Sequence, residues 1–205
     1  MISKKRGLDM RGKSLFIILS SVLVVLLSLS LAKAQSYREN LEVSSLYVYQ
    51  QMFDNADAGQ FSKILELSRQ IEGVIVALET NLSVNIKSQL ESAVASGDKE
   101  KVKGALQKLI FYDIQDVFLT TKSSIKNGAD LGKIKEHLKL AYLDYLIVSS
   151  EAKKIDFGLD RSVRKSFNEL LTGHLAAAVN ASNPGLVEND MATIQDNYRQ
   201  IFADK

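Results

Sequence analysis

One histidine lies where chemistry would be possible. His174 falls in a helical-period apolar stripe with Phe167 and Ala178, so we expect its ring to face the core. A buried neutral imidazole needs partners for its ring nitrogens. The partner is either a hydrogen-bonding side chain or a cation such as a metal ion or haem iron. A noncovalent haem would take Met52 or Met191 as the second axial ligand.

A second histidine begins a series of ionisable residues. His137, Asp144 and Glu151 recur every seven residues, which places them on one side of a helix. At 1.5 Å per residue, neighbours in this series are about 10 Å apart. They would therefore need ligands from other helices to bind one metal ion. The alternative interpretation is a polar stripe at the edge of a helical bundle.

Asp113 is the remaining candidate ligand. It lies between Leu109 and Val117 on an otherwise apolar helix face. A carboxylate there needs an Arg, Lys or hydroxyl partner, or a cation. A different helix phase would instead let Asp113 and Asp116 flank the core.

Motifs for catalysis are missing from the sequence. It has no Gly-rich phosphate loop, no nucleophile elbow and no His-Glu-x-x-His. The chain also contains no cysteine, which excludes a lipoprotein anchor, disulfides, thiolate metal sites and covalent c-type haem. We predict a protein that is not an enzyme.

The elements that would position these residues are helices. Every long segment has a 3.6-residue apolar period and none alternates as a strand does, so we predict an all-α antiparallel bundle of about five to seven helices. Residues 131–148 are apolar on nearly every side, which predicts that they form the central helix, surrounded by others. The remaining helices are expected over 35–53, 61–78, 83–94, 99–126, 160–180 and 184–201.

Turn and cap residues separate these helices. Residues 54–59 have the composition of a turn. Gly97 suits a helix end and Asp98 the start of the next helix. Ser83 and Asp160 are expected as further N-caps, and residues 183–184, Asn-Pro, open the last helix.

The N-terminus has the pattern of a secretory signal peptide. Basic residues precede an apolar run over 15–31, and Ala32-Lys33-Ala34 follows as an A-x-A cleavage pattern. We therefore predict a signal peptide over 1–34 and a single domain over 35–205, in a periplasmic or secreted protein. The alternative is an uncleaved anchor, since about 17 apolar residues can just span a bilayer.

Charge indicates which partners to expect. Residues 1–34 hold six of the 26 basic residues and one of the 24 acidic residues. The rest of the chain is mildly acidic with mixed signs, which is not the pattern of a nucleic-acid-binding protein. We expect a protein partner in the cell envelope, and membrane contact only through the N-terminal segment.

Two short stretches resemble a known group of proteins. Residues 141–145, AYLDY, and 183–188, NPGLVE, resemble the exported helical domains of bacterial iron-uptake systems, which accompany iron permeases or belong to the imelysin-like group. The resemblance implies a periplasmic helical bundle that handles iron or another metal. The imelysin-like His-x-x-Glu is absent, because Leu-Lys-Leu follows His137 and Leu-Ala-Ala follows His174.

The sequence thus predicts an exported, non-enzymatic helical bundle that binds a partner or a metal ion, linked by the resemblance to iron uptake. The alternative is a structural scaffold of the envelope, anchored by an uncleaved N-terminal helix.

Overall fold

A computed structural model describes residues 45–202 of the chain. These residues are helical, with short connections and no strand, which confirms the predicted all-α class. The predicted signal peptide over 1–34 and the start of the expected domain at 35 lie outside the described residues.

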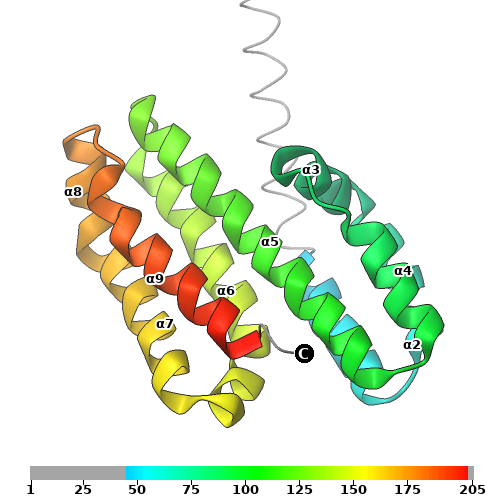
Figure 1. The fold of residues 1–205 in the computed structure, drawn as a ribbon. Coiled ribbons are helices and arrows are strands. Elements are labelled where there is room, and N and C mark those ends of the chain that lie inside the picture. The colour runs from blue at the N-terminus through cyan, green and yellow to red at the C-terminus, as the bar shows by residue number, and fades with distance from the viewer. Residues whose placement is uncertain (1–44, 203–205) are drawn as a thin grey trace, which may run out of the picture. The chain divides into compact units, whose positions relative to one another are not determined.

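The described helices follow one another with short connections (Figure 1). A helical segment over 45–57 comes first. Then come α2 (Phe61–Gln70), α3 (Glu72–Leu82), α4 (Ile86–Ser96), α5 (Lys99–Lys126), α6 (Leu131–Ile155), α7 (Phe157–Glu169), a π-helical turn η1 (Leu170–His174), α8 (Leu175–Asn180) and α9 (Gly185–Phe202).

More helices are found than the five to seven predicted, because two expected helices are divided. The expected helix over 61–78 is interrupted at Ile71, whose backbone leaves helical geometry between α2 and α3. The expected helix after residue 160 is divided by η1 into α7 and α8. The periodic apolar pattern runs through both divisions, so the pattern alone does not reveal them.

The central helix is α5, not α6. It packs against α3 and α4 on one side and against α6 and α9 on the other, and Figure 1 shows it running between these groups. Leu143 and Leu146 of α6 are exposed. The prediction that residues 131–148 are surrounded is therefore wrong, because no helix of the described part covers the Leu143 and Leu146 face.

The caps that end α4 and begin α5 are as predicted. Gly97 takes a left-handed conformation, with φ +66°, after α4. The Asp98 side chain then accepts hydrogen bonds from the amides of Glu100 and Lys101. Both features satisfy backbone groups that a helix end leaves unpaired.

Other predicted boundaries are wrong. Ser83 has a left-handed backbone and ends α3, whereas Asn85 caps α4 by accepting from the Ser88 amide. Asp156 caps α7, so Asp160 lies inside that helix rather than at its cap. The first helix continues to residue 57, and the chain turns only at 58–59.

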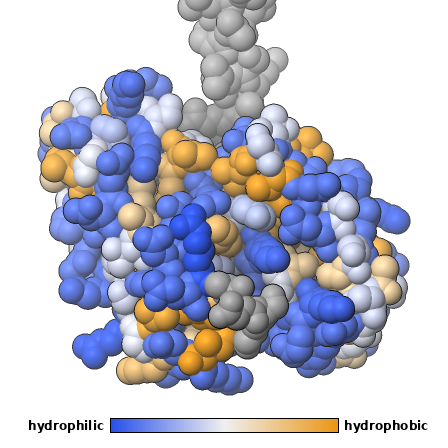
Figure 2. All heavy atoms as spheres, in the orientation of Figure 1, coloured by the Kyte–Doolittle hydropathy of each residue, from blue (hydrophilic) through white to orange (hydrophobic). Residues whose placement is uncertain are grey.

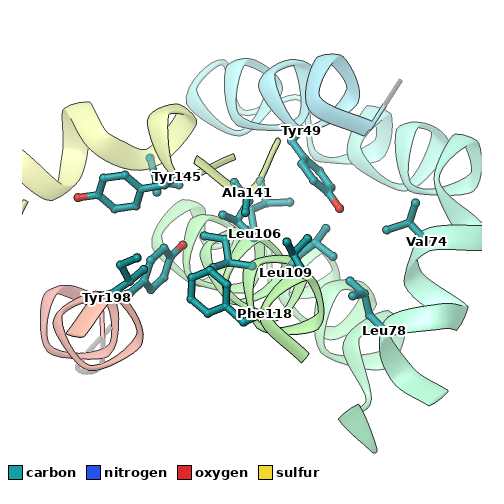
Figure 3. Close-up of a cluster of buried hydrophobic side chains, with 14 of the residues drawn as sticks. Tyr49, Val74, Leu78, Leu106, Leu109, Phe118, Ala141, Tyr145 and Tyr198 are labelled. Carbon is teal, nitrogen blue, oxygen red and sulfur yellow. The ribbon is translucent and has the colours of Figure 1, made fainter. Parts of the chain in front are cut away.

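The hydrophobic core lies on both sides of α5. Figure 3 shows Leu106, Leu109 and Phe118 of α5 between Tyr49, Val74 and Leu78 on one side and Tyr145 and Tyr198 on the other. All of these side chains are buried. A helix that contributes buried residues to both sides holds the two parts of the core together.

Candidate functional site

His174 lies at the surface and not in the core. Its side chain is 53% exposed, and its Nδ1 lies 2.6 Å from Oδ2 of the buried Asp190 on α9. The ring of His174 thus has a hydrogen-bonding side chain as a partner, one of the two kinds of partner that the sequence allows. The hydrogen bond and the negative charge of Asp190 raise the pKa of His174.

The π-helical turn explains the misplacement of His174. The buried residues of α7, η1 and α8 are Val163, Phe167, Leu170, Leu175 and Ala178. A π-turn forms i→i+5 bonds and so takes in one extra residue. This advances the stripe by one position, and Leu175 takes the core place that an uninterrupted α-helix would give to His174.

Two members of the heptad series are buried. His137 and Asp144 lie among the buried residues of α6. They therefore do not form a polar stripe at an edge, because α6 turns this side toward its neighbours and leaves Leu143 and Leu146 outside.

Glu151, the third member of the series, takes part in a network across three elements. Its Oε2 accepts a hydrogen bond from Gln107 Nε2 at 3.0 Å, and its Oε1 lies 3.3 Å from Lys103 Nζ. Lys103 also lies 3.3 Å from Asp57 Oδ1 in the first helix. Burial opposes the charge of Lys103, but the carboxylates of Glu151 and Asp57 more than offset it and raise the Lys103 pKa.

Asp113 is buried, as its apolar neighbours predict. Tyr49 donates its hydroxyl to Asp113 Oδ2 at 2.7 Å, so a hydroxyl partner is present, one of those expected. Asp116 is buried as well and accepts from Asn81 Nδ2 at 2.9 Å. The alternative in which both carboxylates flank the core is therefore wrong.

A buried carboxylate on α7 joins three side chains that none of the sequence predictions connects. Asp160 Oδ1 accepts from the Tyr145 hydroxyl at 2.7 Å and from Ser149 Oγ at 2.9 Å. Arg164 Nε lies 3.0 Å from Asp160 Oδ2. Burial and the Asp160 carboxylate raise the pKa of Tyr145. Asp160 and Arg164 are four residues apart, a spacing at which opposite charges can pair on a helix, so the sequence contains a signal for this contact.

Tyr198 lies beside this polar interior. Its hydroxyl donates to the backbone carbonyl of Gln107 at 2.8 Å. Burial raises its pKa, and the charges of Asp144 and Glu151 add to that shift. The phenol therefore stays protonated and donates a permanent hydrogen bond between α9 and α5.

The candidate ligands do not converge on one point. Among residues 45–202, no group of three His, Asp or Glu side chains is placed to hold a metal ion. Met52 and Met191, considered as haem ligands, are buried, whereas the His174 ring is exposed. The geometry thus gives pairs of polar groups that join helices, rather than one centre.

Two grooves lie on the surface of the described residues. The first, of about 420 Å³, lies between the 45–57 helix and α2 and has a mostly polar lining. The second, of about 170 Å³, lies where α3, α5 and α9 meet. Two of its lining residues are buried, Phe118 and Met191, and Leu119 is exposed. It is lined by Leu82, Gln115, Phe118, Leu119, Lys122, Met191 and Gln195.

Comparison of the chain with protein-family models, curated proteins and solved structures finds no match. Within residues 45–202, none of the helices has both the length and the apolar character needed to span a bilayer.

Proposed function

We propose that this chain is an exported, non-enzymatic helical protein of the cell envelope, periplasmic or secreted, that binds a segment of a protein partner in the α3–α5–α9 groove. The alternative is a structural scaffold anchored by an uncleaved N-terminal helix. A link to iron uptake comes from the resemblance of residues 141–145 and 183–188 to exported domains of such systems.

The groove is the observation that carries the proposal. Leu119 lines it with half of its surface exposed, beside the half-buried Leu82 and the buried Met191. The half-buried amides of Gln115 and Gln195 in the same lining offer donors and acceptors to a peptide backbone or to polar side chains. A lining that combines apolar side chains with amides suits the apolar face of an amphipathic helix.

The interior supports a role without catalysis. Asp160 binds two side chains of α6 and one of its own helix, and Asp190 binds the ring of His174 in η1. Glu151 does the same through Lys103 and Gln107. Carboxylates used in this way fix helices against each other, whereas a catalytic carboxylate must reach a substrate.

A metal-binding role would fall to His174. It is the most exposed of the five candidate ligands, which also include His137, Asp144, Glu151 and Asp113. A histidine held through one ring nitrogen by a carboxylate is oriented as metal-bound histidines are. Metal analysis of protein purified without a histidine tag tests this role, and His174→Gln should remove any bound metal.

The export part of the proposal is tested by fractionation and intact mass. We expect the protein in the periplasm or medium with its N-terminus at Gln35, after the A-x-A pattern. A membrane-bound protein that still carries Met1 would favour the anchored scaffold instead.

The groove is tested by a photo-crosslinking amino acid placed at Leu119 in cells. Leu143, exposed to a similar extent on α6, is the matched control. We expect a discrete cross-linked protein from position 119 and none from 143, and its loss when Met191→Lys places a charge in the groove. Equal cross-linking from both positions would contradict the proposal.

A further inference from the structure

The connection between α6 and α7 presents apolar side chains at a sharp corner. One residue, Asp156, separates the two helices, and residues 153–158 are all exposed. Ile155 is 38% exposed and Phe157 58%. Figure 2 shows apolar surface at the lower edge of the molecule, where Figure 1 draws this connection. Two large apolar side chains exposed within three residues of one connection make this corner a candidate contact surface.

Exposed cations accompany these apolar side chains in the same stretch of chain. Lys153 Nζ lies 5.5 Å from the centre of the Phe157 ring. Lys154 and Arg161 are exposed, and neither forms an ion pair within the described residues. Asp156 is the nearby exposed carboxylate, and it is engaged by the Leu159 amide at 2.9 Å. The corner therefore combines an apolar tip with a net positive rim.

The corner is held in a fixed position by the polar contacts behind it. Tyr145 and Ser149 of α6 both donate to Asp160 of α7. These bonds join the last turns of α6 to the first turns of α7. The tip is thus presented by a rigid pair of helices, so little conformational freedom is lost when it binds.

We propose that this corner, Lys153 to Arg161, docks on an anionic lipid surface. An aromatic ring with a neighbouring aliphatic side chain suits the interface of a bilayer. Basic residues beside it are attracted to anionic headgroups. Residues 153–158 are all exposed, so the corner can meet a flat surface without a pocket to receive it. The inference is independent of the α3–α5–α9 groove.

A single fluorescent label tests the proposal on the full chain. Because the protein has no cysteine, Ile155→Cys gives a unique site for an environment-sensitive nitrobenzoxadiazole label and leaves Phe157 in place. We expect a blue shift and increased emission with phosphatidylglycerol-containing vesicles, and no shift with phosphatidylcholine alone. The label reports its own surroundings, so lipid binding by the N-terminal segment does not produce the signal.

Matched variants complete the experiment. The same label at Leu186→Cys, on a residue exposed at 48%, should show no shift. Phe157→Ser and the pair Lys153→Glu and Lys154→Glu should each abolish the shift at position 155, with helical content unchanged by circular dichroism.

Three results with vesicles would overturn the proposal. They are an unshifted label at 155, an equal shift at 186, or an equal shift on neutral vesicles. A label shielded only by an envelope protein extract, and not by vesicles, would assign the corner to a protein partner and also overturn it.

Discussion

The two sides of α5 are built from different side chains. On the N-terminal side, formed by the 45–57 helix and α2 to α4, the core is mainly aliphatic, with buried residues such as Ile64, Ile71 and Leu78. On the C-terminal side, formed by α6 to α9, aromatic rings contact one another. Phe167 lies 5.1 Å from Tyr142 and 6.2 Å from Tyr145, between ring centres.

The polar contacts of the two sides also differ. On the C-terminal side, Asp160 pairs with Arg164, and Asp190 with His174. On the N-terminal side, the buried Asp116 accepts a hydrogen bond from the neutral amide of Asn81. The ion pair of Lys87 with Glu72 on that side is solvent-exposed. Charged and hydrogen-bonded groups fix the geometry of a core more narrowly than aliphatic contacts do. The C-terminal side should therefore be the more sensitive to both packing and charge.

The largest expected effect comes from the aromatic cluster. Phe167→Ala removes a fully buried ring that contacts Phe118, Tyr142 and Tyr145, and it should lower the free energy of unfolding by about 4 kcal/mol. Leu78→Ala, equally buried on the other side, should cost about 3 kcal/mol. Urea unfolding followed by circular dichroism measures both. A larger loss for Leu78→Ala would contradict the comparison.

The next effect concerns the buried carboxylate on α7. Asp160→Asn weakens the bonds from Tyr145, Ser149 and Arg164 together, and it should cost about 2 kcal/mol. The matched control is Asp196→Asn, since Asp196 pairs with Arg199 at the surface and should change stability by less than about 0.5 kcal/mol. Equal losses in the two variants would show that burial adds nothing to the Asp160 contacts.

Local sequence signals predicted the helices well. Helix α5 spans residues 99–126 as predicted and begins after the predicted Asp98 cap, because caps act through bonds within a few residues. The buried face of α9, with Val187, Met191 and Tyr198, likewise follows the apolar period. Such features need no knowledge of what packs against the helix.

The errors arise where the prediction depends on distant residues or on one extra residue in a turn. The apolar period predicts His174 in the core because it assumes an uninterrupted α-helix. The extra residue that η1 adds cannot be recognised from the period. Glu151 has two partners, Lys103 and Gln107, and both lie on another helix. Asp160 is expected as a cap because it closes the predicted loop over 156–160 and Asp is a preferred N-cap residue. Its burial depends on the packing of α6.

A smaller effect tests the link between the two sides. Lys103 lies between Asp57 on the N-terminal side and Glu151 on the C-terminal side. Lys103→Met keeps the aliphatic packing and removes the charge, so Glu151 keeps Gln107 but loses its cation. We expect a loss of about 1 kcal/mol in the free energy of unfolding. The control Lys139→Met, at an exposed pair with Glu136, should be nearly neutral, and an equal effect of both changes would argue against a structural role for the network.

The smallest effect concerns His174. The Asp190 carboxylate raises the pKa of His174 in the folded protein, so the protonated ring stabilises the fold. That stability is fully present below the unfolded pKa of about 6.5 and is lost as the pH rises through the folded pKa. Because the ring is half-exposed, we expect a change of only a few tenths of a kcal/mol.

Unfolding free energies between pH 5.5 and 8.5 measure this change in the wild type and in His174→Gln. The difference between the two proteins removes the contribution of His137, which both contain, and it should shrink as the pH rises. His174→Leu should be less stable than the wild type across the whole range, because it removes the ring nitrogen that lies beside the buried Asp190. A wild-type curve parallel to that of His174→Gln would mean that the contact does not change the protonation of His174, and it would remove this reason to expect a pH response from the C-terminal side.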